Sequence, residues 1–240
     1  MKRSTNRILT THAGRLDGPP DLRQMTMAIQ SGTSSDIEAI RPRVRTAIAE
    51  IVRKQSDCGI DIVSDGELGK IGFGMAYYGR RLTGLSTRKV QPGEGWMGHN
   101  TGERKEFAEF YHDLGFERFM PPERVVCTGP ISYIGQQEVA SDIAFYQAAL
   151  ADSGAKIEEA FMCVLAPGWL EHFFHNEHYA KDEDYIFALA DAMKHEYKAI
   201  VDAGFVCSLT IRLCPIRTTC WSRARRSRSI ANSPPSALKR

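Results

Sequence analysis

The sequence lacks any long hydrophobic run, and this excludes whole classes of protein. No stretch approaches the roughly 18 consecutive apolar residues that a membrane span requires. The chain starts with the polar segment MKRSTNR, which has none of the apolar core of a secretory signal peptide. We therefore expect a cytoplasmic protein that has no membrane partner.

Closely spaced cysteines are absent as well. The six cysteines contain no CxxC pair, so they fit reduced thiols better than a disulfide framework. Hydrophobic residues make up 42% of the chain and charged residues 25%, which is typical of a globular protein and excludes a disordered, collagenous or coiled-coil one. A chain of 240 residues allows one large domain or two small ones.

Acidic residues are missing from one end of the chain. Residues 208–240 hold eight Lys or Arg and no Asp or Glu, whereas the preceding residues hold the other 23 basic residues and all 29 acidic ones. A segment rich in Arg and Ser repels itself and offers little core. We therefore divide the chain into a folded domain at 1–206 and a basic, disordered tail at 207–240.

Segments with strand and helix patterns alternate through the first part of the chain. Strand-like apolar runs begin near residues 8, 60, 125, 160 and 205. The helical patterns between them end at Gly59, Gly154 and Gly204, and Ser141 is a candidate N-cap for the second helix. This alternation predicts an α/β fold with a parallel sheet and helical crossovers.

Two architectures share this alternation, a doubly wound open sheet and a barrel of βα units. The open sheet usually carries a glycine-rich phosphate loop after its first strand, and the segment HAGRL at 12–16 does not fit the pattern GxGxxG. We therefore favour the barrel, with its site at the carboxyl ends of the strands. The long polar segment 81–122 is predicted to be an inserted loop or hairpin over that site.

Five segments of the chain resemble a known family. They are ILTTHAG at 8–14, IVRKQSDCGIDIVSDGELGKIGF at 51–73, CTGPISYIG at 127–135, APG at 166–168 and NEHYAKDEDYIFALADAMKHEYKAIVDAGF at 176–205. In order and spacing they resemble the cobalamin-independent methionine synthase family, and more narrowly its short single-barrel members. The resemblance extends over most of the chain up to residue 206.

The resemblance implies a (β/α)8 barrel, of which about five of the eight βα units have a counterpart here. It also implies a zinc-dependent methyltransferase of methionine biosynthesis. Such an enzyme transfers a methyl group from a folate-type donor to a thiol such as homocysteine, and a zinc-bound thiolate attacks the methyl donor. The expected partners are therefore a small-molecule thiol and a methyl donor.

Three residues are predicted to bind the substrate. Asp65 and Glu67 follow a buried strand, where alternation puts both side chains on one side, and the resemblance matches Glu67 to a residue that binds the ammonium group of an amino-acid substrate. His12 follows the first strand and could donate a hydrogen bond to a carboxylate or a phosphate. The simpler alternatives are two solvated loop acids and a histidine that caps a strand end. No catalytic residue is assigned.

A zinc site is expected for the family, but the sequence offers no suitable ligands for one. Three histidines lie three residues apart: His172, His175 and His178. On a helix the first and third would lie about 120° apart, so they do not form a ligand set. Cys163 stands in an apolar strand and is predicted to be a buried apolar residue. The family's His-x-Cys pair is absent, so we expect this chain to bind no zinc.

The sequence departs from the family at both ends. Arg15 and Gly18 stand where the family pattern THxGSxPR has serine and arginine. The strand that starts at Phe205 lacks the acidic Asp-Asp-Pro or Asp-Glu-Pro turn that should follow it. Residues 207–212, if encoded TGC AGT CTG ACG ATC CGG, give Gln-Ser-Asp-Asp-Pro when read from the last base of the first codon. We therefore interpret the tail as out of frame and the chain as a truncated, inactive copy.

Two other functions stay open at this point. One is a related zinc-dependent thiol alkyltransferase that acts on a different thiol. The other is a nucleic-acid-binding module, in which the segment WSRARRSRS binds phosphates. A tail selected for nucleic-acid binding would encode Asp-Asp-Pro in the shifted reading frame only by chance, and this counts against that alternative. A barrel with missing units would expose apolar helix faces, so we also expect self-association.

Overall fold

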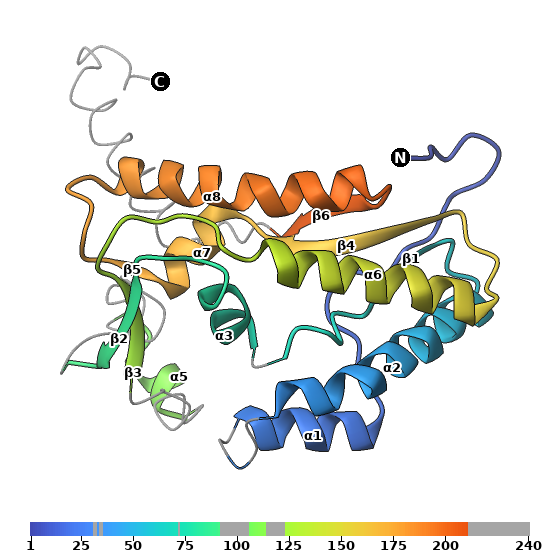
Figure 1. Ribbon diagram of the computed structural model, residues 1–240, viewed down its shortest axis with the longest axis horizontal. Helices are drawn as coiled ribbons and strands as arrows, with labels where there is room; N and C mark the ends of the chain where they lie inside the picture. Colours follow the sequence, from blue (N-terminus) through green and yellow to red (C-terminus); the bar gives the residue numbers. More distant parts are fainter. Residues whose placement is uncertain (31–32, 34–35, 72, 92–105, 114–122, 211–240) are drawn as a thin grey trace, which may run out of the picture.

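The computed structural model describes residues 1–30, 33, 36–71, 73–91, 106–113 and 123–210 (Figure 1). Helices and strands alternate along the chain. The strands form two sheets of three strands each. The predicted α/β class is therefore confirmed. None of the helices in these ranges is both long and apolar enough to cross a bilayer.

The first sheet is parallel and lies in the centre of the molecule. It consists of β1 (Ile62–Ser64), β4 (Glu159–Leu165) and β6 (Val206–Thr210), in the order β1-β4-β6. The pairs Val63↔Ala160 and Cys163↔Ser208 fix the register. These strands are rich in Val, Phe, Met and Leu, as expected for a parallel sheet that helices cover.

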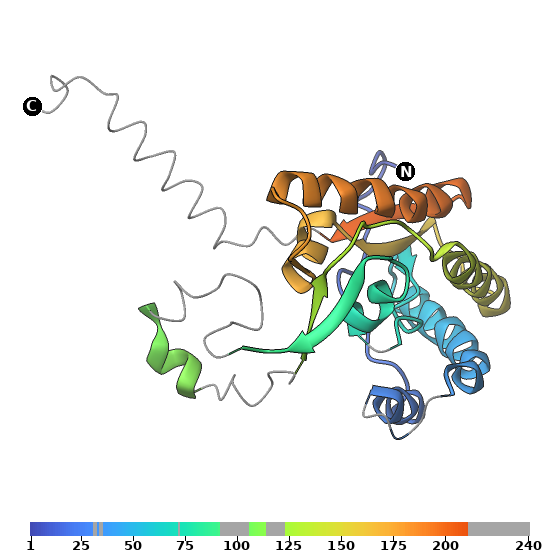
Figure 2. The ribbon, with the colours of Figure 1, turned by 60° about the vertical axis from the view of Figure 1, so that its left-hand side comes forward.

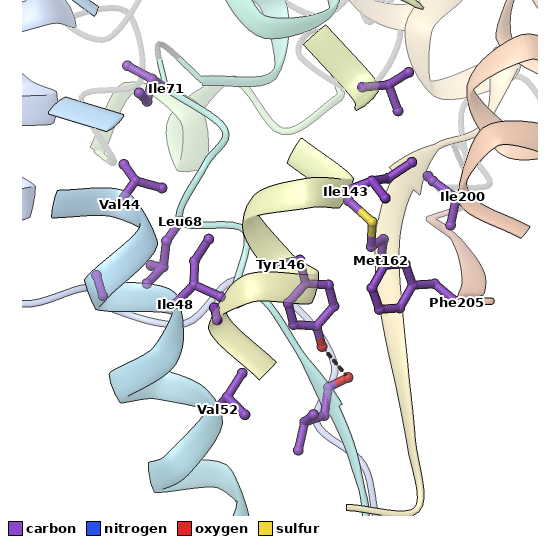
Figure 3. Packing of buried hydrophobic residues seen from close by; sticks show 14 of the residues in the cluster. Val44, Ile48, Val52, Leu68, Ile71, Ile143, Tyr146, Met162, Ile200 and Phe205 are labelled. Carbon is purple, nitrogen blue, oxygen red and sulfur yellow. Dashed lines mark hydrogen bonds between the residues drawn. The ribbon is translucent and has the colours of Figure 1, made fainter. Parts of the chain in front are cut away.

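Three helices cover one face of this sheet, namely α2 (Ile37–Asp57), α6 (Gln136–Ser153) and α8 (Asp182–Asp202) (Figures 1 and 2). Their apolar stripes meet the sheet in one core (Figure 3), whose labelled side chains are Val44, Ile48, Val52, Leu68, Ile71, Ile143, Tyr146, Met162, Ile200 and Phe205. Complete burial of one such side chain stabilises the fold by about 1.5–3 kcal/mol.

The helix boundaries follow ordinary capping rules, with one exception to the sequence prediction. The side chain of Asp36 accepts the Ala39 N–H at 2.9 Å and caps α2. Helix α6 ends at Gly154, which has a left-handed φ of 61°, as predicted. The N-cap prediction at Ser141 is wrong, because α6 begins at Gln136 and the Ser141 hydroxyl instead donates to the Gln137 carbonyl.

The second sheet lies at the left-hand side of the molecule in Figure 1, apart from α1 (Pro20–Gln30), which lies at the bottom of that view. Strand β2 (Leu85–Lys89) pairs antiparallel with β3 (Glu123–Cys127), which pairs parallel with β5 (His175–Asn176). The predicted insertion at 81–122 thus contributes β2 and α5 (Ala108–Asp113). Its segments 92–105 and 114–122 lie outside the described residues.

A second apolar core packs beside this sheet. It includes residues of α3 (Phe73–Gly79), α7 (Pro167–Phe173) and the first half of α8. Its most buried side chains are Tyr78, Leu170, Phe174, Tyr185, Leu189 and Met193. The molecule therefore has two cores, and α8 contributes to both.

The described residues do not form a closed barrel. Strand β3 pairs with β2 and β5, so β1 pairs directly with β4. The predicted first strand at 8–11 is also wrong, because only Thr11 forms a bridge, to Ile62. The N–H of Thr10 donates to the Asp61 carboxylate at 2.8 Å instead of to a neighbouring strand, and Ile8 is 83% exposed.

Strand β6 crosses the boundary that the sequence predicts at residue 206. It extends to Thr210, so residues 207–210 pair with β4. The rest of the predicted basic tail, residues 211–240, lies outside the described residues. The division of the chain into a domain and an out-of-frame tail stays a prediction.

Candidate functional site

The turn that follows β1 brings two acidic residues together at the carboxyl end of the strand. The Asp65 carboxylate accepts the Glu67 N–H at 3.0 Å, and the Glu67 carbonyl accepts the Lys70 N–H at 3.2 Å. Glu67 has a φ of 58° and is the only non-glycine with positive φ in the described part of the chain. That conformation costs about 1–2 kcal/mol, and such strain often marks a functional position.

Lys70 ties this turn to the neighbouring strand. Its Nζ donates to Glu67 Oε2 at 2.9 Å and to the backbone carbonyl of Cys163 on β4 at 2.7 Å. The whole Lys70 residue is 8% exposed, and its Nζ lies 5.7 Å from the centre of the Tyr78 ring. We call Asp65, Glu67 and Lys70 the Glu67 cluster.

The electrostatics of the Glu67 cluster follow from its burial. Burial raises the pKa of Asp65 to about 6, although the charge of Lys70 opposes this. Burial acts to lower the pKa of Lys70, but Tyr78, Glu67 and Asp65 outweigh it and hold that pKa above its ordinary value. With both acids ionised, two negative charges face one positive charge, so the cluster carries a net charge of about −1.

His12 lies in a segment that runs beside this turn. Thr11 bridges to Ile62 in β1, and the Leu16 N–H donates to the Gly66 carbonyl at 3.2 Å. The His12 Nε2 atom is buried and has no hydrogen-bond partner within the described ranges. The structure therefore joins Asp65 and Glu67 through the turn, and it leaves His12 alongside without a bond to either acid.

Side chains from three helices hold the strand ends beside the Glu67 cluster. Gln55 of α2 donates to the Ser64 carbonyl at 2.8 Å and accepts the Ser64 N–H at 3.0 Å. The Tyr78 hydroxyl accepts the Leu165 N–H at 3.1 Å, and the Tyr197 hydroxyl donates to the Leu165 carbonyl at 2.7 Å. These side chains satisfy the backbone polar groups that the short strands leave open.

The described residues do not supply the ligands of the family's zinc site. They contain no group of three or more His, Cys, Asp or Glu placed to hold a metal ion. Cys163 pairs with Ser208 and Cys207 pairs with Met162, so the two thiols stand on opposite faces of the sheet. Burial raises the pKa of both thiols to about 11. The described residues therefore offer no set of donors that fits zinc. The expectation that the whole chain binds no zinc stays a prediction.

A second group of buried charges lies between α3, α6 and α8. The Arg81 guanidinium is 1% exposed and forms ion pairs with Glu138 at 3.2 Å, with Asp142, and with Glu196 at 3.0 Å. The Nη1 atom that faces Glu196 is not aligned for a hydrogen bond, so this contact is purely electrostatic. The Tyr77 ring centre lies 3.9 Å from the guanidinium carbon. We call Arg81 and its three acids the Arg81 cluster.

Three cavities in the described part of the chain are not lined by the acids of the Glu67 cluster. A cavity of about 390 Å³ is lined by the first residues of the chain and Glu158. Another, of about 230 Å³, lies between α2 and α6 beside the Arg81 cluster. A third cavity, of about 260 Å³, borders the turn at Leu68 and is otherwise lined by residues between positions 15 and 27. None of the three is lined by Asp65 or Glu67. We rank the Glu67 cluster above them because it combines a strained backbone, buried charge and the carboxyl end of a parallel strand.

Two solved structures share this fold. A putative vitamin-B12-independent methionine synthase from Listeria monocytogenes has a TM-score of 0.54 and 20% sequence identity, over 85% of this chain and 52% of that one. A B12-independent methionine synthase from a Shewanella species, solved with selenomethionine, has a TM-score of 0.51 and 15% identity, over 83% of this chain and 50% of that one.

The present chain thus spans about half the length of these two proteins. No protein-family model matches the chain, and no curated protein matches it. At such low identities the likeness shows a shared fold, that of B12-independent methionine synthases. It agrees with the family resemblance found in the sequence at the level of fold.

Proposed function

We propose that this chain is methionine-synthase-like and binds an amino-acid thiol, such as homocysteine, at the Glu67 cluster. We expect it to lack methyltransferase activity of its own, because the described residues offer no set of zinc ligands. In this proposal the strands belong to a partial (β/α)8 barrel of about five units. The fold shared with two methionine synthases supports the reaction class. The position of the acids at the carboxyl end of a parallel strand supports the site.

The observation that carries the proposal is that one oxygen of the Glu67 carboxylate has no hydrogen-bond donor among the described residues. Its side chain is 21% exposed, and Lys70 occupies only Oε2. No described residue donates a hydrogen bond to Oε1, so this oxygen can accept one from a ligand. A cluster with a net negative charge favours a cationic group, and the α-ammonium of an amino acid is such a group. The Shewanella protein was solved with selenomethionine, which also carries an α-ammonium group.

Glu67 and His12 contact the substrate in this proposal. Glu67 accepts a charge-assisted hydrogen bond from the substrate ammonium. His12 offers its unpaired Nε2 to the substrate carboxylate. The reaction moves a methyl group from a folate-type donor to the sulfur of the thiol. Zinc would supply the activated thiolate in the family, and no step is assigned to it here because the described donors do not fit it.

Binding of two matched thiols tests the site. Isothermal titration calorimetry should show that L-homocysteine binds about tenfold or more tightly than 4-mercaptobutanoate, which lacks the amino group. Glu67→Gln should remove this preference, whereas Glu177→Gln, at a carboxylate paired with Arg88 at the surface, should keep it. Equal binding of the two thiols by the unmodified chain would contradict the proposal.

A methyl-transfer assay tests the reaction class. Purified chain is incubated with a methyl-folate donor, added zinc and a panel of thiols, and the methylated products are measured by mass spectrometry. We expect no product, and any product that does form should come from an amino-acid thiol such as L-homocysteine. Methylation of thiols without an amino group would instead favour the related thiol alkyltransferase.

A further inference from the structure

Lys70 has a part in the Glu67 cluster that the sequence resemblance does not assign. We propose that Lys70 is a positioning residue that keeps Asp65 and Glu67 ionised together and holds one oxygen of Glu67, so that the cluster presents a single net negative charge to the substrate ammonium. This inference rests on the function proposed above. It adds the residue that sets the charge and orientation of the acceptor.

The geometry fixes the Lys70 side chain from two directions. Its ammonium lies between the Cys163 carbonyl on β4, at 2.7 Å, and Glu67 Oε2 in the turn after β1, at 2.9 Å. The Tyr77 and Tyr78 rings lie at 5.9 and 5.7 Å, within the range of a cation–π contact. A buried ammonium held in this way can hold Glu67 Oε2 in one place, which leaves Oε1 directed to a ligand.

The charge balance explains why a cation is needed at this place. The buried Asp65 carboxylate and the partly exposed Glu67 carboxylate repel each other, so without a cation they tend to retain one proton between them, which would cancel half of their charge. The described titratable and charged groups around Asp65 and Lys70 include Glu67 in the same turn, Tyr77 and Tyr78 of α3, Asp142 and Tyr146 of α6, and Cys163 of β4. His12 lies in the segment beside the turn. Lys70 is the only lysine or arginine among these described residues, and His12 Nε2 has no hydrogen bond to either acid, so we assign to Lys70 the role of keeping both acids ionised.

The consequence is a defined dependence of ligand binding on pH. Asp65, whose pKa burial raises to about 6, loses its proton above that pH. The cluster then gains its net negative charge, and preference for an amino group appears. Without Lys70 the acid pair retains a proton to a higher pH. The preference should therefore appear only at a higher pH.

The test measures this preference across pH. L-Methionine and its analogue without the amino group, 4-(methylthio)butanoate, are titrated into the full chain from about pH 5 to pH 9, and the ratio of their dissociation constants is plotted. In the unmodified chain we expect a preference of about tenfold or more that declines below about pH 6. In Lys70→Met the pH at which half of this preference is reached (the midpoint) should rise by more than about one unit, and Lys70→Arg should restore the original midpoint.

Two further variants separate this role from general damage. Lys198→Met breaks an exposed ion pair with Asp202 and should leave the midpoint unchanged. Lys70→Gln keeps a donor for the Cys163 carbonyl but removes the charge, so it should shift the midpoint as Lys70→Met does. Circular dichroism shows which variants are folded. If neither neutral variant folds, carboxyl ¹³C NMR of the unmodified chain decides, because two acids that share a proton at about pH 7.5 would overturn the proposal.

The outcomes distinguish the inference from the function on which it rests. If the unmodified chain shows no preference for the amino group, the proposed function fails and the role of Lys70 fails with it. If Glu67→Gln abolishes the preference but folded Lys70→Met keeps the original midpoint, the proposed function stands and the inference is wrong. A raised midpoint in Lys70→Met together with its recovery in Lys70→Arg supports both.

Discussion

The Glu67 cluster and the Arg81 cluster are two groups of buried charge in one molecule, and they differ in the number of acids around the cation and in the strain of the backbone. Arg81 is surrounded by three carboxylates and an aromatic ring, and Glu196 also accepts the Tyr133 hydroxyl at 2.8 Å. In the Glu67 cluster, by contrast, one lysine faces two acids and Glu67 has a strained backbone. The two clusters share buried charge, so we separate them by the strained backbone of Glu67 and by its position at a strand end.

The position of each cluster agrees with this difference. The Arg81 cluster links α3, α6 and α8, so its contacts fasten helices to one another. The Cγ of Arg81 lies 2.6 Å from where a Cβ on Gly135 would stand, so a side chain there would displace the arginine. The Glu67 cluster lies at a strand end, where a ligand can approach without separating two helices. We expect the first cluster to govern stability and the second to govern binding.

The largest expected effect is a loss of stability when Arg81 is removed. Arg81→Met leaves Glu196, which is 1% exposed, buried without its cation. We expect the free energy of unfolding to fall by about 3–5 kcal/mol, measured by urea denaturation. The control is Arg45→Met, whose ion pair with Asp152 is about half exposed and should cost under about 1 kcal/mol. Equal losses in the two variants would remove the distinction between the clusters.

The next effect is a dependence of stability on pH that Asp65 causes. Its pKa in the folded chain is raised to about 6 from 3.8, so between these values the folded chain binds more protons than the unfolded chain. The free energy of unfolding therefore falls as pH rises from about 4 to about 6. Asp65→Asn should remove a fall on the order of 2 kcal/mol, measured as the difference between unfolding curves at pH 4 and pH 7. Parallel pH profiles for the two proteins would contradict this.

A smaller effect is expected at the strand beneath the Glu67 cluster. The Tyr146 hydroxyl donates to the Val63 carbonyl at 3.0 Å (Figure 3), and its ring stacks on Phe205 at 4.8 Å. Tyr146→Phe should cost about 1–2 kcal/mol, because the buried carbonyl loses its partner. The preference for amino-acid ligands should remain. A loss of that preference would show that the site depends on this strand contact more than the comparison of the two clusters allows.

The smallest effect isolates the backbone strain at Glu67. Glu67→Ala and Glu67→Gly both remove the carboxylate and its ion pair with Lys70. They differ only in the Cβ atom of alanine. The backbone at this position has a φ of 58°, which glycine adopts without strain and alanine does not. Glu67→Gly should therefore be more stable than Glu67→Ala by about 1 kcal/mol. Equal thermal midpoints would show that the turn relaxes and stores no strain.

The sequence predicts well where local chemistry decides the structure. The strands near residues 60, 125, 160 and 205 are confirmed, as are the helix ends at Gly59, Gly154 and Gly204. Each of these glycines has a positive φ, so an αL stop could be inferred from the residue type. The alternation of strands and helices was enough to predict the α/β class.

The sequence predicts poorly where distant residues compete for the same backbone groups. The segment 8–11 has a strand composition, but the Asp61 carboxylate accepts the Thr10 N–H, and the segment forms only one isolated bridge, at Thr11. Ser141 has the chemistry of an N-cap, yet five helix-compatible residues precede it and α6 starts earlier. The β3 pairing with β2 and β5 likewise depends on contacts that no local pattern contains.

The candidate site divides in the same way. Asp65 and Glu67 could be predicted because they directly follow a buried strand. Lys70 was missed, although its spacing of three residues from Glu67 was a usable signal for an ion pair. Gln55 and Tyr78 carried no such signal, because their partners are backbone groups of strands elsewhere in the chain.

The bond between Lys70 and the Cys163 carbonyl joins residues that are 93 positions apart in the chain. Closing so long a loop costs conformational entropy before the contact forms, so the site exists only after β4 has docked beside β1. A ligand at the Glu67 cluster therefore binds the native chain and not the unfolded one. Each bound molecule then stabilises the whole fold by mass action, so an upward shift in melting temperature would report an occupied site in a screen that needs no assay of the reaction.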